Sequence, residues 1–141
     1  MMPLMRVTFR DLEPLIDWEG NERCGFLIGD GKRIMAIWPT PSLSPSPSSY
    51  SIGYLAWREA KARARKEGVL LMGSIHTHTY GDYGPSKKDL RIARRLDEGD
   101  YRAVWHIRSG TVTLYDRSGI LYSKGVRNPL WLRRAARRVF I

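Results

Sequence analysis

The stretch Gly73-Ser-Ile-His-Thr-His-Thr-Tyr-Gly-Asp-Tyr-Gly-Pro-Ser-Lys-Lys-Asp-Leu90 decides how this chain is organised. It continues an apolar run that begins at Val69, and this run predicts a buried strand with His76 and His78 at its carboxyl end. Residues two apart along a strand share a face, so both imidazoles point to the same side of the sheet. Because neutral imidazole is a common zinc ligand, the pair indicates a metal site.

A helix is predicted to begin shortly after the histidines. Pro85 and Ser86 open it, with Ser86 as the N-cap and Asp89 three residues later in the first turn. The loop between strand and helix is expected to fold Asp89 back toward His76 and His78. A catalytic zinc takes three protein ligands and leaves the fourth position to water, whose pKa drops to about 7. The two histidines and the aspartate would complete such a set, whereas Ser86 taken alone is a helix cap.

Taken jointly, these four residues have the spacing His-x-His-x7-Ser-x2-Asp, which resembles the motif of the JAMM (MPN-plus) zinc metalloprotease family. That family carries a glutamate upstream in the context Glu-x-x-Gly-x-Leu-x-Gly. Residues 22–29 of this chain, Glu-Arg-Cys-Gly-Phe-Leu-Ile-Gly, fit the context. The resemblance therefore extends over most of the chain.

The resemblance implies a role for each residue of the motif. Zn²⁺ would be held by His76, His78 and Asp89, and Glu22 would act as general base and then as general acid. Ser86 would donate a hydrogen bond to the oxyanion of the tetrahedral intermediate, a role that its use as a cap could exclude. The expected reaction is hydrolysis of a peptide or isopeptide bond at the C-terminal tail of a ubiquitin-like or sulfur-carrier protein, and this substrate class rests on the resemblance alone.

The fold class expected is α/β, a mixed β-sheet flanked by helices in the three-layer JAB/MPN (cytidine-deaminase-like) architecture. A length of 141 residues suits a single domain over residues 1–141. No apolar stretch approaches the roughly 18 residues of a membrane span, and the N-terminus has no secretory pattern, so a cytoplasmic protein is expected.

Local patterns place the other elements. A short helix is predicted from Val7 to Trp18, and Asp30-Gly31 predicts a tight hairpin turn between strands at residues 23–28 and 33–38. The stretch Pro39–Ser49 holds four prolines and is expected to be an extended loop beside the site, outside any ladder. The remaining predictions are helices at residues 54–66 and 87–96 and strands at residues 69–75, 101–107, 111–115 and 120–122.

Pro129 opens a final amphipathic helix. Its apolar residues are Trp131, Leu132, Ala135, Ala136, Val139 and Phe140, and its basic residues are Arg133, Arg134, Arg137 and Arg138. The pattern favours packing on the sheet with a solvated basic face. Together with the net charge of +10, that face would also attract acidic protein surfaces, and nucleic acid without sequence specificity.

Other functions remain open from the sequence: a non-catalytic MPN-type scaffold, or a nucleic-acid-binding module that uses the arginine-rich surface. A deaminase-type zinc site is excluded because it needs a Pro-Cys-x-x-Cys segment, and Cys24 is the only cysteine. His106 is interpreted as a structural strand histidine and Asp82 as a weaker loop candidate. The oligomeric state is not indicated.

Overall fold

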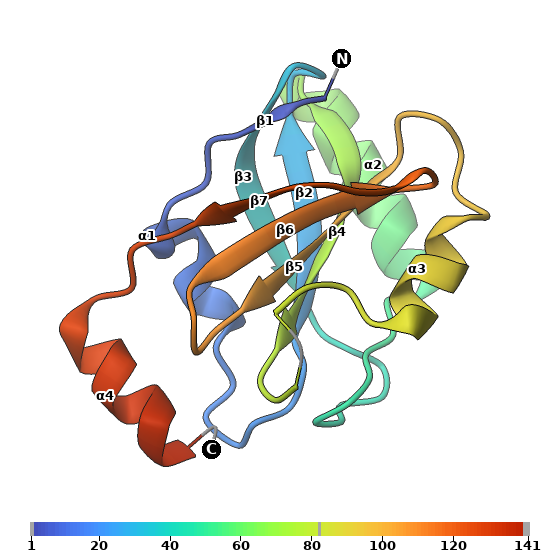
Figure 1. The fold of residues 1–141 in the computed structure, drawn as a ribbon. Coiled ribbons are helices and arrows are strands. Elements are labelled where there is room, and N and C mark those ends of the chain that lie inside the picture. Colours follow the sequence, from blue (N-terminus) through green and yellow to red (C-terminus); the bar gives the residue numbers. More distant parts are fainter. Residues whose placement is uncertain (1, 82, 140–141) are drawn as a thin grey trace.

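The computed structural model describes residues 2–81 and 83–139, with side chains up to residue 136 (Figure 1). Within these residues one seven-stranded sheet has the order β1-β3-β2-β4-β5-β6-β7. The strands are β1 (Leu4–Met5), β2 (Cys24–Gly29), β3 (Arg33–Thr40), β4 (Leu70–His78), β5 (Tyr101–His106), β6 (Thr111–Asp116) and β7 (Gly119–Gly125). β1 pairs with β3 and β4 with β5 in parallel, while the other neighbours are antiparallel.

Helices cover both faces of this sheet and make three layers (Figure 1). On one face lie α1 (Phe9–Leu12), the 3₁₀ turn η1 (Glu13–Leu15) and α4 (Leu130–Val139), which bury Leu12, Leu15 and Leu132 in the main apolar core. On the other face lie α2 (Tyr54–Glu67) and α3 (Lys87–Ala93). The predicted α/β fold with a mixed sheet flanked by helices is confirmed. No helix among the described residues is both long and apolar enough to cross a membrane.

A bulge in β4 decides which side chains face α2 and α3. Leu27 pairs with Gly73 but its neighbour Ile28 pairs with Leu71, so β4 carries one extra residue at this point. Gly73 has φ +151°, and a Cβ there would lie 1.7 Å from the carbonyl oxygen of Tyr101 on β5. Only glycine fits this close approach. Beyond the bulge the alternation is regular, so Ser74 and the two histidines that follow share one face.

The first helix is shorter than the sequence predicts. The α-helical turn ends at Leu12, η1 follows with Pro14 inside it, and Ile16 is already extended at ψ 124°. Pro14 supplies no backbone donor, so the chain closes one 3₁₀ turn and leaves the helix. The predicted apolar positions nevertheless reach the core, with Ile16 8% exposed.

β3 is longer than predicted, because Pro39 and Thr40 pair with Gly25 and Cys24. The expectation that the whole proline-rich stretch avoids the ladder is wrong for these two residues. β1 pairs with β3 only around Arg33 and Ile34 among the described residues, so Pro39 lies where β3 is the outer strand. A proline is tolerated there because its missing N–H would have pointed away from the sheet.

The last helix packs through its apolar side, as predicted. Leu132 is fully buried, and the ring of Trp131 lies 6.0 Å from that of Phe9 and 6.3 Å from that of Trp18. The basic residues Arg133 and Arg134 are exposed. Arg137, Arg138, Val139 and Phe140 lie outside the described side chains.

Candidate metal centre

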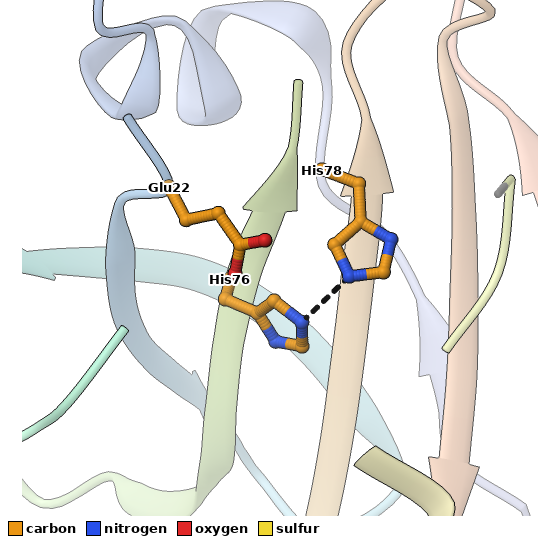
Figure 2. A group of neighbouring side chains, drawn as sticks. All are labelled: Glu22, His76 and His78. Atoms are coloured by element: carbon orange, nitrogen blue, oxygen red, sulfur yellow. Dashed lines mark hydrogen bonds between the residues drawn. The ribbon is translucent and has the colours of Figure 1, made fainter. Parts of the chain in front are cut away.

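β4 delivers two histidines to the face of the sheet that α2 and α3 cover. The side chains of His76 and His78 are buried, at 1% and 7% exposure for the whole residues. Their Nε2 atoms lie 3.2 Å apart, as the dashed line in Figure 2 marks. The strand extends through both histidines, beyond the predicted end at Ile75. Their alternation on β4 therefore brings two nitrogen donors together, as the sequence predicted.

Asp89 reaches the same point from the first turn of α3. Its Oδ2 lies 3.3 Å from Nε2 of His76 and 3.4 Å from Nε2 of His78. The three atoms thus form a nearly equilateral triangle. Zinc ligands 2.0–2.1 Å from a tetrahedral ion are about 3.3–3.4 Å from one another. The triangle has the size of one face of such a tetrahedron, so these donors fit a zinc ion.

A capping box at the start of α3 orients Asp89. The backbone N–H of Ser86 donates to Oδ2 of Asp89 at 2.9 Å, and the N–H of Asp89 donates to Oγ of Ser86 at 3.0 Å. Ser86 therefore is the predicted cap. In this cap its hydroxyl oxygen accepts, so the hydroxyl hydrogen stays free to donate to another group. Capping does not exclude the second role that the resemblance implies for Ser86.

Glu22 approaches the histidines from the segment just before β2. Glu22 is 6% exposed, and one of its carboxylate oxygens, a ring nitrogen of His76 and a ring nitrogen of His78 all lie within 4.8 Å of one another (Figure 2). These three residues form a group that could hold a metal ion. The antiparallel pairing of β2 with β4, in which Cys24 lies opposite His76, is what brings Glu22 here.

The ionisation of these groups suits metal binding. Burial lowers the pKa of His76, so its imidazole is neutral at pH 7. Burial alone would raise the pKa of Asp89, but hydrogen bonds with His76, His78 and the Ser86 N–H outweigh it and bring the pKa well below its usual range. A neutral imidazole and a carboxylate are the forms that bind a cation.

Glu22 differs from Asp89 in its ionisation. Burial raises the pKa of Glu22 to about 7, against the opposing influence of His78. A carboxyl group with this pKa exchanges a proton readily near neutral pH. Their surroundings therefore separate the pKa values of the two acidic residues. Asp89 is held as a carboxylate, whereas Glu22 can take or give a proton.

Two further residues at the site, the aromatic Tyr50 and the charged Arg102, were not predicted from the sequence. Tyr50 stacks on the His76 ring, with centroids 4.2 Å apart and planes 19° apart. Arg102 on β5 lies opposite Ser74 in the parallel β4–β5 pair. Neither belongs to a local motif, and only strand pairing and the return of the proline-rich loop bring them to the site.

The candidate metal site opens into a pocket of ≈ 490 Å³. The pocket is lined by the candidate site residues Glu22, His78, Ser86 and Asp89 and, on the loop expected beside the site, by Pro47, Ser48 and Ser49. The expectation that this loop lies next to the site is confirmed for these three residues. A substrate therefore has room on the face where the donors converge.

The other two candidate residues have different outcomes. His106 is 5% exposed, and its Nδ1 lies 2.7 Å from Oγ of Ser109, within the turn that follows β5. This contact agrees with a structural strand histidine. Asp82 lies outside the described residues.

Relatives of the chain agree with this fold. The sequence model of a family described as prokaryotic homologues of the JAB domain matches residues 15–118. A protein of Desulfitobacterium hafniense has a similar solved structure, with a TM-score of 0.65 and 22% identity over 89% of this chain and 92% of its own. A JAB1/MPN domain protein of Archaeoglobus fulgidus has a TM-score of 0.53 and 18% identity over 89% of this chain and 100% of its own.

A protein of Salinibacter ruber is also similar, with a TM-score of 0.52 and 22% identity over 77% of this chain and 78% of its own. At these identities the structural likeness supports the fold alone. No curated protein matches the chain.

Proposed function

We propose that this chain, which belongs to the family of prokaryotic homologues of the JAB domain, is a zinc-dependent hydrolase of peptide or isopeptide bonds. The observation that carries the proposal is the triangle formed by Nε2 of His76, Nε2 of His78 and Oδ2 of Asp89, whose sides measure 3.2, 3.3 and 3.4 Å. These three residues would hold a zinc ion beside the pocket that Glu22, His78 and Asp89 line, where it would supply a Lewis acid to water or a substrate carbonyl.

Two sets of three donors are available, and the distances favour one of them. Oδ2 of Asp89 lies 3.3 and 3.4 Å from the two imidazole nitrogens, a spacing that matches zinc, whereas the donor atoms of the set that includes Glu22 are placed only within a wider limit of 4.8 Å. A tetrahedral zinc site needs donors about 3.3 Å apart. We therefore assign His76, His78 and Asp89 as the ligands and leave Glu22 beside the ion.

Glu22 is then the proton carrier of the reaction. When bound, zinc would polarise the scissile carbonyl and acidify the attacking water. The carboxylate of Glu22 takes the proton from that water and passes it to the departing amine. The hydroxyl of Ser86 donates to the oxyanion while its oxygen remains in the helix cap.

The proposed substrate is the C-terminal tail of a ubiquitin-like or sulfur-carrier protein. Its support is the resemblance of the motif to the JAMM family and the pocket of ≈ 490 Å³ beside the donors, which can receive an extended tail. The net charge of +10 favours substrates with an acidic surface by raising their association rate. The same charge predicts that cleavage slows as ionic strength rises.

Glu22→Gln tests the catalytic part of this proposal. We expect the variant to keep one zinc ion per chain and to cleave a ubiquitin-like fusion about 10²–10⁴-fold more slowly, because it has lost the proton carrier. Zinc is measured by atomic emission and cleavage by gel. Glu19→Gln is the matched control, since Glu19 is exposed and outside the site. Wild-type cleavage rates in the Glu22→Gln variant would remove Glu22 from the mechanism.

His76→Ala tests the ligands separately. We expect zinc affinity to fall by at least about a hundredfold, because the loss of a residue that only hydrogen-bonds a metal ligand already costs about 10–100-fold. His106→Gln controls for the loss of a histidine outside the triangle and should keep the zinc. Zinc bound tightly by the His76→Ala variant would overturn the ligand set. Zinc binding without cleavage in the wild-type protein would instead favour the non-catalytic scaffold.

A further inference from the structure

The pocket beside the metal site continues along the sheet between α2 and α3. Trp57 and Ile52 form its wall on the α2 side, and the α3 side contributes Ile92, Ala93 and Leu96. Its floor consists of Ser74 on β4, Arg102 on β5 and Tyr115 on β6. This part of the lining thus sets one guanidinium group among apolar side chains, in a pocket that Glu22, Lys88 and Asp89 also line.

Arg102 is held in place, but only part of its guanidinium group is used in hydrogen bonds. Its Nη1 donates to Oδ1 of Asp100 and, at 2.9 Å, to the carbonyl oxygen of Tyr101. Its side chain is only 15% exposed, and the guanidinium carbon lies 5.2 Å from the centre of the Trp57 ring. Nε and Nη2 have no hydrogen-bond partner among the described residues. The ion pair with Asp100 therefore fixes the orientation of the fork and leaves two of its nitrogens for another acceptor.

Tyr115 supplies a second donor next to it. Arg102 and Tyr115 are directly paired across β5 and β6, so their side chains leave the sheet side by side. Tyr115 is 1% exposed and lines the pocket, and its hydroxyl has no hydrogen-bond partner among the described residues. A phenol hydroxyl that lines the pocket can donate to a group that enters it. Arg102 and Tyr115 are therefore two adjacent donors that can share one acceptor.

We propose that Arg102 and Tyr115 form a subsite for a carboxylate of the substrate. A guanidinium fork beside a phenol hydroxyl matches the two oxygens of a carboxylate. The subsite adds a substrate feature to the proposed hydrolase function. Its role in catalysis rests on that proposed function, whereas carboxylate binding itself does not need the metal.

The position of the subsite limits where the carboxylate lies in the substrate. Arg102 is opposite Ser74, which precedes His76 by two residues on β4, a distance of about 6–7 Å along the strand. An extended substrate advances about 3.3–3.6 Å per residue. The carboxylate therefore belongs to a residue one or two positions from the cleaved bond, either as an acidic side chain or as the chain terminus.

Binding of small probes to metal-free protein tests the subsite without relying on catalysis. N-acetyl-L-leucine and N-acetyl-L-leucinamide differ only in a terminal carboxylate, and the amides of N-acetyl-L-glutamate and N-acetyl-L-glutamine differ only in a side-chain carboxylate. Dissociation constants are measured by NMR, with the indole N–H of Trp57 as reporter. We expect at least one acid to bind about tenfold or more tightly than its amide, as a charge-assisted hydrogen bond would give. The pair that discriminates identifies the source of the carboxylate.

Three variants then assign the preference to these residues. Arg102→Gln should abolish the preference for the acid, Tyr115→Phe should reduce it by about three- to fivefold, and Arg102→Lys should restore part of it because charge is kept but the fork is lost. Arg91→Gln removes the same charge from an exposed position on α3 outside the pocket, and should leave the preference unchanged.

Equal binding of acid and amide in both pairs would overturn the subsite, and so would a preference that survives in a folded Arg102→Gln protein. Unfolding of that variant would not hide the answer, because Arg102→Lys keeps the partner of Asp100 and is judged by the same measurement. Loss of the proposed hydrolase function would appear differently: the wild-type protein would still prefer the acid but would cleave no fusion with zinc bound.

Discussion

The two faces of the central sheet use alternate residues of the same strands for different ends. Toward α1 and α4, β4 and β5 present Ile75 and Trp105, which are fully buried in the main apolar core. Toward α2 and α3 the same strands present His76 and Arg102. One face stabilises the domain by burying apolar surface, and the other holds polar groups whose burial costs free energy unless a partner satisfies them. The stability and the chemistry of this domain can therefore be altered separately.

The largest difference between the effect on stability and the effect on zinc binding is expected from Ile75→Ala. The side chain is fully buried on the apolar face, so its truncation should lower the free energy of unfolding by about 2–5 kcal/mol. Zinc stoichiometry at a temperature where the variant is folded should be unchanged, because the side chains of the chain neighbours Ser74 and His76 point to the other face. Urea unfolding and metal analysis check both parts. Loss of zinc from the folded variant would show that the faces are coupled.

Glu22, on the polar face, is expected to make the free energy of unfolding depend on pH. In metal-free protein the folded pKa of Glu22 is about 7, above the ordinary 4.5. A raised pKa means that folding favours the protonated form, so the stabilisation is fully present below pH 4.5 and is lost as pH rises through 7. Between pH 5 and 8 the wild-type protein should therefore lose about 2 kcal/mol more than Glu22→Gln.

Urea unfolding of both proteins with chelator present measures this difference directly. Parallel stability curves for the two proteins across this pH range would mean that Glu22 is not held in a desolvated position.

The smallest effect is expected from the helix caps, which both faces possess. At α1 the hydroxyl of Thr8 donates to Oδ2 of Asp11 at 3.1 Å, and at α3 the hydroxyl oxygen of Ser86 accepts from the N–H of Asp89 at 3.0 Å. Thr8→Ala and Ser86→Ala should each cost about 1 kcal/mol of stability. Only Ser86→Ala should also weaken zinc binding, because only Asp89 faces the histidines. Equal zinc affinities in the two variants, by chelator competition, would separate the cap from the metal site.

The positions of the candidate metal donors were predictable because each depends on residues nearby in the chain. His76 and His78 share a face by alternation, and the Ser86–Asp89 pair obeys the rules of a capping box. Helix ends were less predictable, since the early end of α1 follows from the way Pro14 closes a 3₁₀ turn.

Arg102 and Tyr115 could not be predicted as part of the pocket. They are brought together by the pairing of β5 with β6, and they reach the metal site through the parallel pairing of β5 with β4. No local signal in the sequence states which strands become neighbours. Tyr50 is similar, because it reaches His76 only when the proline-rich loop returns to the sheet.

By itself the sequence determined the kinds of donor, their alternation on one strand and the helix start that carries Asp89, since these features follow from backbone geometry over a few residues. The place of Glu22 beside the histidines was implied by the resemblance, and the pairing of β2 with β4 produces it. The tertiary structure alone decided that burial raises the pKa of Glu22 to about 7 and that Arg102 and Tyr115 share a pocket floor. The physical reason is that strand neighbours and desolvation are set by contacts between residues far apart in the chain.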